Sequence, residues 1–463
     1  MQIPVKRKQT KYIIIALTIL IYAVFYIHDG VVWGVDTAGY QNMVLSREPG
    51  YSLLMRIFLV IFGERYFAQV LVFCQMLLSC AVTCILTFTV ESIWELKDLS
   101  IYIIWGIQVV FLLLCRFGSG LSAIYPSTVL TEGVTYSLYF LYFKALLQLN
   151  REMSKKRLAE VMFYCILMML VRTQLIVSFL GLMALWFLKA VFKHVSWKKW
   201  FLIVGGSLVS ILFVISVDKL YTRILYGVPT GVVGSSSFFF VSGIYGAQEE
   251  DAELFEDPEE RLIFTDIYAL CDVEKANIQY AGNGFFGGVS YYCNQFDVIK
   301  YSIANVYMKQ YYEMQGINDP VEQEILTDDM YKRIGMPLFG DNIAVKVRIS
   351  LQDIARSMMR TIAKASLILI PYVILAYGIY LFLMFKLFHK HGEHMTAWAG
   401  LFVLLMLLGN ALVLSILIFG EPRYLLYNMA PFYIMGYLML REVTLKKKGV
   451  QSDDSGVVSS HME

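Results

Sequence analysis

The sequence predicts an all-α polytopic membrane protein with about ten transmembrane helices and an extracytoplasmic domain inserted between the seventh and eighth spans. Of its 463 residues, 58% are hydrophobic and 16% are charged, whereas soluble domains average about 45–50% apolar and about 25% charged. Apolar segments that approach the roughly 20 residues of a spanning helix recur along the chain. One long polar segment separates the first seven of them from the last three.

The first apolar segment follows a basic N-terminus and lacks a small-residue cleavage site, so we interpret it as a retained helix rather than a signal peptide. The short fifth segment is separated from the sixth by three residues, and the two form either a tight hairpin or one bent pair. The predicted spans are Lys11–Ile27, Tyr66–Val90, Leu99–Cys115, Val129–Leu149, Leu158–Val171, Leu175–Phe192, Trp200–Val217, Ala363–Phe388, Thr396–Phe419 and Tyr424–Leu440.

Lysine and arginine gather in alternate loops, and such loops face the cytoplasm. With ten spans, all five basic clusters fall on one side of the membrane, which predicts cytoplasmic N- and C-termini. The clusters are Lys6–Lys11, Arg151–Arg157, Lys189–Lys199, Lys386–Lys390 and Lys446–Lys448.

The predicted division of the chain follows from this topology. Residues 1–217 form a transmembrane module whose first outer loop is 28–65, 218–361 form the extracytoplasmic domain, 362–442 form the last helices, and 443–463 form a disordered cytoplasmic tail. In the outer domain we expect helices at Leu254–Leu270 and Asp353–Ile362, with a helix start at Asp257. Its two cysteines, Cys271 and Cys293, would be free to pair in an oxidising compartment, but their spacing does not establish a disulfide.

Composition also limits the function. The chain has no long basic stripe, so nucleic acid is not an expected partner. We see neither an Asp-x-Asp motif nor a histidine cluster suited to a transition metal, so we favour a metal-independent activity without a cofactor, although a divalent metal stays possible.

The first outer loop carries the strongest catalytic candidate. Asp36 lies in an otherwise apolar run, VVWGVDTAGY, and ionisable residues at a membrane boundary are functional candidates. The alternative is that Asp36 caps a short helix. Asp29, directly after the first span, is interpreted as a solvated interfacial charge.

Three further charged residues fall on the same predicted outer side. Glu132 opens a span, where the helix dipole alone would favour a carboxylate. Arg172, at the tip of the hairpin, and Arg423, before the last span, could simply anchor their helices by snorkelling. Together, however, these charges suit an anionic, partly lipidic substrate, because guanidinium groups bind phosphate.

In order and sidedness, these motifs resemble the C-type membrane glycosyltransferases (the GT-C superfamily), which include protein O-mannosyltransferases and aminoarabinose transferases. The matching pieces are the acidic first loop with Asp36, Arg47-Glu-Pro-Gly-Tyr51 leading into an amphipathic stretch (Ser52–Phe62), Thr131-Glu132, Met169–Gln174 and Pro422–Pro431. The chain departs from the commoner pattern in placing its soluble domain between spans and in having a single acid at the first-loop position.

The resemblance implies transfer of a sugar from a polyprenyl-phosphate donor to a glycan, glycolipid or protein acceptor on the outer side of a plasma membrane. It also implies that this membrane is bacterial. It implies that Asp36 is the general base, that inversion occurs at the anomeric carbon, and that the substrate and donor phosphate are bound by Glu132, Arg172, Arg423, Tyr40, Arg47 and Tyr424.

Two other classes remain open. A lipid-linked polysaccharide polymerase or ligase would share the donor and the outer site, but it would be expected to have basic rather than acidic outer loops. A lipid or sugar transporter would carry polar residues deep within its spans. Gln75 and Asn410 are such residues, and each is better explained as a hydrogen bond between packed helices.

Overall fold

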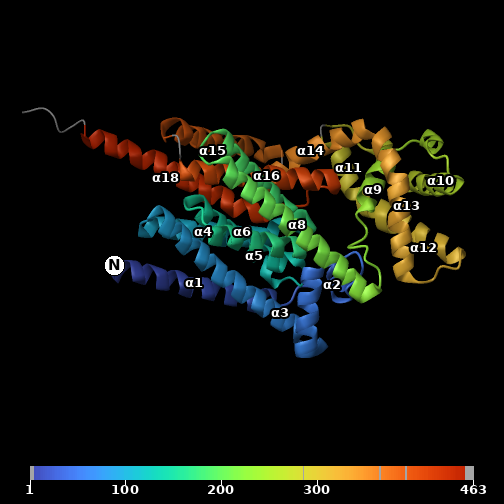
Figure 1. The fold of residues 1–463 in the computed structure, drawn as a ribbon, viewed down its shortest axis with the longest axis horizontal. Helices are drawn as coiled ribbons and strands as arrows, with labels where there is room; N and C mark the ends of the chain where they lie inside the picture. Colours follow the sequence, from blue (N-terminus) through green and yellow to red (C-terminus); the bar gives the residue numbers. More distant parts are fainter. Residues whose placement is uncertain (1–4, 285, 364–366, 392–393, 454–463) are drawn as a thin grey trace, which may run out of the picture.

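The protein is helical, with two hydrophobic cores arranged along its long axis (Figure 1). The computed structural model describes residues 5–284, 286–363, 367–391 and 394–453. Within these residues, β-type pairing is confined to an isolated bridge between Val32 and Thr128. The protein is therefore a multi-pass helical membrane protein, as its composition predicts.

The larger core belongs to a bundle of long helices, and the predicted spans fall on helices of this bundle as far as they are described. Residues 364–366 of the eighth predicted span lie outside the described residues. The helices of the bundle are α1 (Val5–Asp29), α2 (Thr37–Gln41), α3 (Pro49–Trp94), α4 (Asp98–Gly118), η1 (Tyr125–Ser127), α5 (Thr131–Arg151), α6 (Lys155–Val171), η2 (Thr173–Ile176), α7 (Val177–Val191), α8 (Trp197–Tyr226), η6 (Leu367–Leu369), α15 (Ile370–His391), α16 (Met395–Leu417), α17 (Pro422–Leu425), η7 (Leu426–Asn428) and α18 (Met429–Asp453).

The smaller core lies in what we call the polar domain (residues 236–362), which sits at one end of the bundle (Figure 1). At Asp257 the side chain accepts from Glu259 N at 2.8 Å, which confirms the predicted helix start. Cys271 and Cys293 are free thiols, so the possible disulfide is not formed. The helices are α9 (Ser236–Gly246), η3 (Glu249–Leu254), α10 (Pro258–Val273), η4 (Ile278–Tyr280), α11 (Gly287–Asp297), the π-helix η5 (Val298–Ala304), α12 (Asn305–Met314), α13 (Pro320–Asp341) and α14 (Ile343–Ile362).

Seven of the described helices are long and apolar enough to cross a membrane, and the count of ten stays a prediction. Among the long helices outside those seven, α5 has a clear physical reason for its polar content. Sixteen of its 21 residues are buried, and it packs against α3, α6 and α16. A helix enclosed by other helices has little contact with lipid, so it can carry hydroxyls and Glu132 without exposing them to hydrocarbon.

Helix α3 is bent at Gly63, whose backbone has φ +68°, a conformation that glycine adopts without strain. The segment before the bend carries exposed apolar side chains, including Ile57, Val60 and Ile61, while Tyr51 and Met55 on its other face are buried. This matches the amphipathic stretch that the sequence predicts at Ser52–Phe62 and suits a helix lying on a bilayer surface.

The start of α3 approaches the end of α6 so closely that only glycine fits at position 50. A Cβ on Gly50 would lie 2.6 Å from the carbonyl oxygen of Leu170. This contact sets the first turn of α3 beside Arg172, which follows α6 directly.

Helix α14 holds the turn that leads into α17. Asp353 accepts hydrogen bonds from Ser415 Oγ at 2.7 Å and from Gly420 N at 2.6 Å. Because α14 also packs against α9 and α11, this turn connects the polar domain to the segment that carries Arg423.

At the C-terminus, α18 continues as a helix to Asp453, beyond the start of the predicted disordered tail (443–463). The last part of that tail, 454–463, lies outside the described residues.

Replacing Gly50 by alanine should lower the free energy of unfolding by about 1–3 kcal/mol, the range typical of overpacking. Thermal unfolding of the detergent-purified protein measures this. Gly205, inside α8 with open space around it, is the matched control, and alanine there should be neutral or stabilising by up to about 1 kcal/mol. Equal effects at the two positions would contradict the close-approach argument.

Candidate active site

Asp36 occupies the N-cap position of α2 but does not cap it with its side chain. Its carboxylate instead accepts from Arg47 Nη2 at 2.7 Å and pairs with Arg423 Nη1 at 3.4 Å. The side chain of Asp36 therefore does not act as a helix cap. It faces the guanidinium groups of Arg47, in the same loop, and of Arg423, near the other end of the chain.

Backbone pairing brings the first loop against the start of α5. Val32 N donates to Ser127 O and Val129 N donates to Val32 O, both at 2.9 Å. Thr37 Oγ1 then donates to Val129 O at 2.8 Å. These bonds hold Asp36 near the first turn of α5, where Glu132 lies.

Glu132 is almost fully buried, with 3% of its surface exposed. It sits in the first turn of α5, and its Oε1 lies 3.2 Å from Arg172 Nη2 and 3.9 Å from Arg423 Nε. Thus Arg423 is shared between Asp36 and Glu132, and it also pairs with Glu421 at 2.5 Å.

Arg172 does not snorkel towards an interface. It is 9% exposed, it pairs with Glu132, and its guanidinium carbon lies 4.1 Å from the centroid of the Tyr424 ring. The corresponding distance for Arg423 is 4.7 Å. Tyr424 therefore contributes a cation–π contact to both arginines.

Tyr40 and Arg47 complete the group of residues that the sequence analysis named. The Arg47 guanidinium carbon lies 5.0 Å from the centroid of the Tyr40 ring, and Tyr40 packs edge-on against Tyr51 at 5.4 Å. Tyr51 donates to Gln75, which donates in turn to Pro126 O and Thr128 O. All seven predicted site residues thus lie in one connected cluster. Gln75 does not make the expected hydrogen bond between two packed spans; it bonds to Tyr51 of the same helix and to the connection between α4 and α5.

The cluster, which we call the ionic site, combines three carboxylates with three guanidinium groups: Asp36, Glu132, Glu421, Arg47, Arg172 and Arg423. Burial by itself raises the pKa of Asp36, but the charges of Arg47 and Arg423 outweigh it and hold that pKa below its ordinary value. Asp36 is therefore ionised at neutral pH.

Two donors of the ionic site are unused. Arg47 Nε and Arg172 Nη1 are buried and have no hydrogen-bond partner among the described residues. Buried polar groups normally find partners, so these two N–H groups are candidate hydrogen-bond donors to a ligand.

The interpretation of Asp29 as a solvated charge is wrong. Its side chain is fully covered, and it accepts from Arg116 Nη1, from His28 Nδ1 at 2.9 Å and from Ile124 N at 3.1 Å. Because the chain folds back at residues 119–130, Asp29 is enclosed and serves to hold that loop beside the first.

The polar domain adds charged residues that the sequence analysis missed. Asp297, Lys300 and Tyr301, around the π-helix η5, interact electrostatically with Asp36 of the ionic site. Nothing in the local sequence, FDVIKYS, distinguishes them from an ordinary solvated helix face. A π-helix is rare and often found at functional sites, but it cannot be predicted from amino-acid composition.

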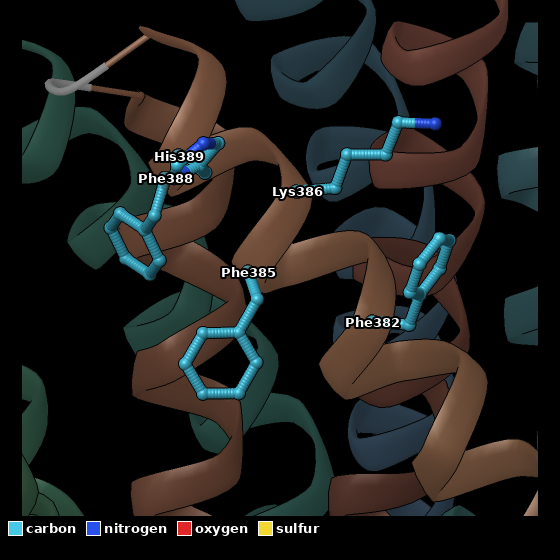
Figure 2. A pocket seen from close by; sticks show the side chains of 5 residues that line it. All are labelled: Phe382, Phe385, Lys386, Phe388 and His389. Carbon is cyan, nitrogen blue, oxygen red and sulfur yellow. The ribbon is translucent and has the colours of Figure 1, made fainter.

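The described residues contain no group of three or more His, Cys, Asp or Glu side chains that could hold a metal ion. A shallow hollow does lie near the C-terminal end of α15 (Figure 2), where Phe382 and Phe385 are exposed. Its lining is aromatic apart from Lys386 and His389, and no residue of the ionic site takes part in it. Such a surface suits lipid chains rather than catalysis.

Comparisons of the chain with protein families, with curated proteins and with solved structures found no match.

Replacing Glu132 by glutamine should lower the free energy of unfolding by about 3–5 kcal/mol, because it leaves the buried charge of Arg172 uncompensated. Chemical or thermal unfolding tests this. Glu313, which pairs on the surface with Lys309 at 3.8 Å, is the control, and its glutamine variant should change stability by less than about 1 kcal/mol.

The double variant Glu132→Gln/Arg172→Met should recover part of that loss, since it removes the buried charge together with its partner. A double variant no more stable than Glu132→Gln would show that the pair is not the source of the effect.

Proposed function

We propose that this protein is an integral-membrane glycosyltransferase of the GT-C type. It transfers a sugar from a polyprenyl-phosphate donor to an acceptor on the outer face of the membrane. The observation that carries the proposal is the ionic site, in which an ionised, non-capping aspartate lies beside guanidinium groups with unused, buried donors.

In the proposed reaction, the acceptor oxygen attacks the anomeric carbon while Asp36 takes the proton of the acceptor hydroxyl. The bond between the anomeric carbon and the phosphate oxygen breaks, and its electron pair leaves with polyprenyl phosphate. Arg172 and Arg423 hold the negative charge that develops on that phosphate. A single displacement of this kind inverts the anomeric centre.

The ion pairs suggest how the base is controlled. In the structure Arg423 is shared between Asp36 and Glu132. A donor phosphate that takes up Arg423 would withdraw positive charge from Asp36 and raise its pKa towards the ordinary value. The aspartate would then become a stronger base only when the donor is in place.

We assign Glu132 a different role from the direct binding of substrate that the resemblance implies. Its carboxylate is occupied by Arg172 at 3.2 Å, so we assign it the orientation of that guanidinium. Tyr40 and Tyr424 hold Arg47, Arg172 and Arg423 by their ring faces, and they are placed to define where the donor phosphate binds.

Replacing Asp36 by asparagine should lower the rate of sugar transfer by about 10²–10⁴-fold, the usual contribution of a general base. The measurement is transfer from polyprenyl-phosphate monosaccharides by the purified protein. Asp341→Asn, at an exposed position at the end of α13, is the control and should keep full activity.

Equal activity of the Asp36→Asn and wild-type proteins would remove Asp36 from the mechanism. If neither protein turned over any monosaccharide donor while the wild type bound a lipid-linked oligosaccharide, the polymerase or ligase class would replace the present proposal.

Replacing Arg423 by glutamine should lower kcat by about 10²–10³-fold, as removal of one transition-state donor does elsewhere. The loss should be larger with donors whose leaving group is more basic, because those depend more on charge stabilisation. A uniform loss across a series of donors, confined to KM, would instead indicate ground-state binding only.

A further inference from the structure

A cavity of about 360 Å³ lies at the end of the bundle opposite the ionic site. Helix α5 connects the two places, because Glu132 lies in its first turn and Arg151 in its last. A helix of this length extends over about 30 Å. The end of α3, the end of α5 and the start of α6 meet at the cavity. Its size falls within the range of ligand sites in proteins, about 300–1,000 Å³.

Two arginines from different helices line this cavity. Arg157, in the first turn of α6, donates to Gln148 Oε1 at 2.7 Å and pairs with Glu160 at 3.2 Å. Its guanidinium group is therefore held in place. Arg151 is exposed, and its only side-chain hydrogen bond among the described residues is a long one, 3.5 Å, to the carbonyl oxygen of Ser92. Most of the N–H groups of Arg151 thus remain free for a ligand.

Positive charge exceeds negative charge around the cavity. The stretch 144–160 contains five lysines and arginines but only two acidic residues, Glu152 and Glu160. Glu152 lines the cavity, whereas Glu160 is shared between Arg157 and Lys144, which lies 2.6 Å from it. The first turn of α6 holds no acidic residue, so the positive end of the helix dipole adds to the excess. An anion in the cavity would therefore be stabilised.

The α3 side of the cavity is partly apolar, because Phe88 and Ile93 line it. Ile85 lies on the same face of α3 as Phe88, since residues three apart on a helix are neighbours, and it is 41% exposed. An apolar strip therefore runs from the cavity along α3 towards the middle of this candidate span. Lys11 lies 5.2 Å from the ring centroid of Phe88 but is paired with Glu91 at 2.7 Å.

We propose that this cavity binds the phosphate headgroup of an anionic phospholipid, in the leaflet on the side of the membrane opposite the ionic site. Arg151 and Arg157 bind the phosphate oxygens, because guanidinium groups match the geometry of phosphate. The acyl chains lie along Phe88 and Ile85. Basic pockets between spanning helices suit anionic headgroups. A soluble phosphate compound would use the same arginines but would leave the apolar strip uncovered. This site is independent of the proposed sugar transfer.

Native mass spectrometry of the detergent-purified full-length protein, titrated with phosphatidylglycerol, tests the site. Phosphatidylcholine with the same acyl chains should bind more weakly, because its choline group neutralises the phosphate. Arg151→Gln should weaken phosphatidylglycerol binding about tenfold, as expected for the loss of a hydrogen bond between charged groups. Its thermal unfolding without lipid should match the wild type. Lys198→Gln, at an exposed lysine near the start of α8, is the control and should bind normally.

Ser92→Trp separates a formed cavity from diffuse surface charge. Ser92 lines the cavity and is exposed, so a tryptophan there fills the cavity without removing a charge or disturbing the core. It should weaken phosphatidylglycerol binding as much as Arg151→Gln does. Unchanged binding in Ser92→Trp, or equal losses in Arg151→Gln and Lys198→Gln, would overturn the cavity as the binding site.

Glycerol phosphate distinguishes a lipid from a soluble phosphate compound, because it carries the phosphate without acyl chains. If the occupant is a lipid, glycerol phosphate should not displace phosphatidylglycerol. Glycerol phosphate that binds as tightly as phosphatidylglycerol, and loses this binding in Arg151→Gln, would overturn the lipid assignment. The cavity would then be a site for a soluble phosphate compound.

Discussion

The assembly of the bundle depends on the ion pairs of the ionic site, in which buried positive and negative charges neutralise each other. Glu132 and Arg172 are almost fully buried, and a buried charge without a partner costs several kcal/mol. The charges linked to this pair come from segments far apart in the sequence. Arg423, which pairs with Glu132 and with Asp36, follows α16, while Asp36 and its other partner Arg47 precede α3. The first loop, the hairpin between α6 and α7 and the turn before α18 must therefore assemble together.

The surrounding structure is arranged to make that assembly possible. Gly50 allows α3 to begin against the end of α6, the Val32–Thr128 bridge fixes the first loop, and Asp353 holds the turn before Arg423. Each of these contacts is a backbone approach or a hydrogen bond to backbone. The site is thus positioned by main chain, and its charged side chains need little freedom to meet.

Much of this arrangement could be predicted from the sequence. The seven predicted site residues share one property that is visible without a structure: each lies near the same end of an apolar helix, by the basic-loop rule. Residues at the same end of packed helices are neighbours in space, so sidedness alone brought Asp36, Glu132, Arg172 and Arg423 together. Their pairing followed from opposite charge.

The missed features depend on contacts that sequence order does not encode. Asp29 is buried because the loop after α4 folds back over it, and an interfacial acid covered by a loop has the same sequence as a solvated one. Lys300 lies in a π-helix, and its charge acts on Asp36 because of the orientation of a whole domain. The count of spans also stayed open, because α5 is shielded by its neighbours and need not be apolar.

The bend at Gly63 has a consequence for the surroundings in which the protein works. Before the bend, α3 exposes an apolar face suited to the bilayer surface, and its first turn carries Tyr51 beside the ionic site. After the bend, the same helix spans the bundle. If the segment before the bend lies on the bilayer surface, the height of the site above the hydrocarbon is tied to the thickness of the lipid layer, because mismatch is relieved by tilt or local thinning. A change in lipid composition would then change the geometry of the site.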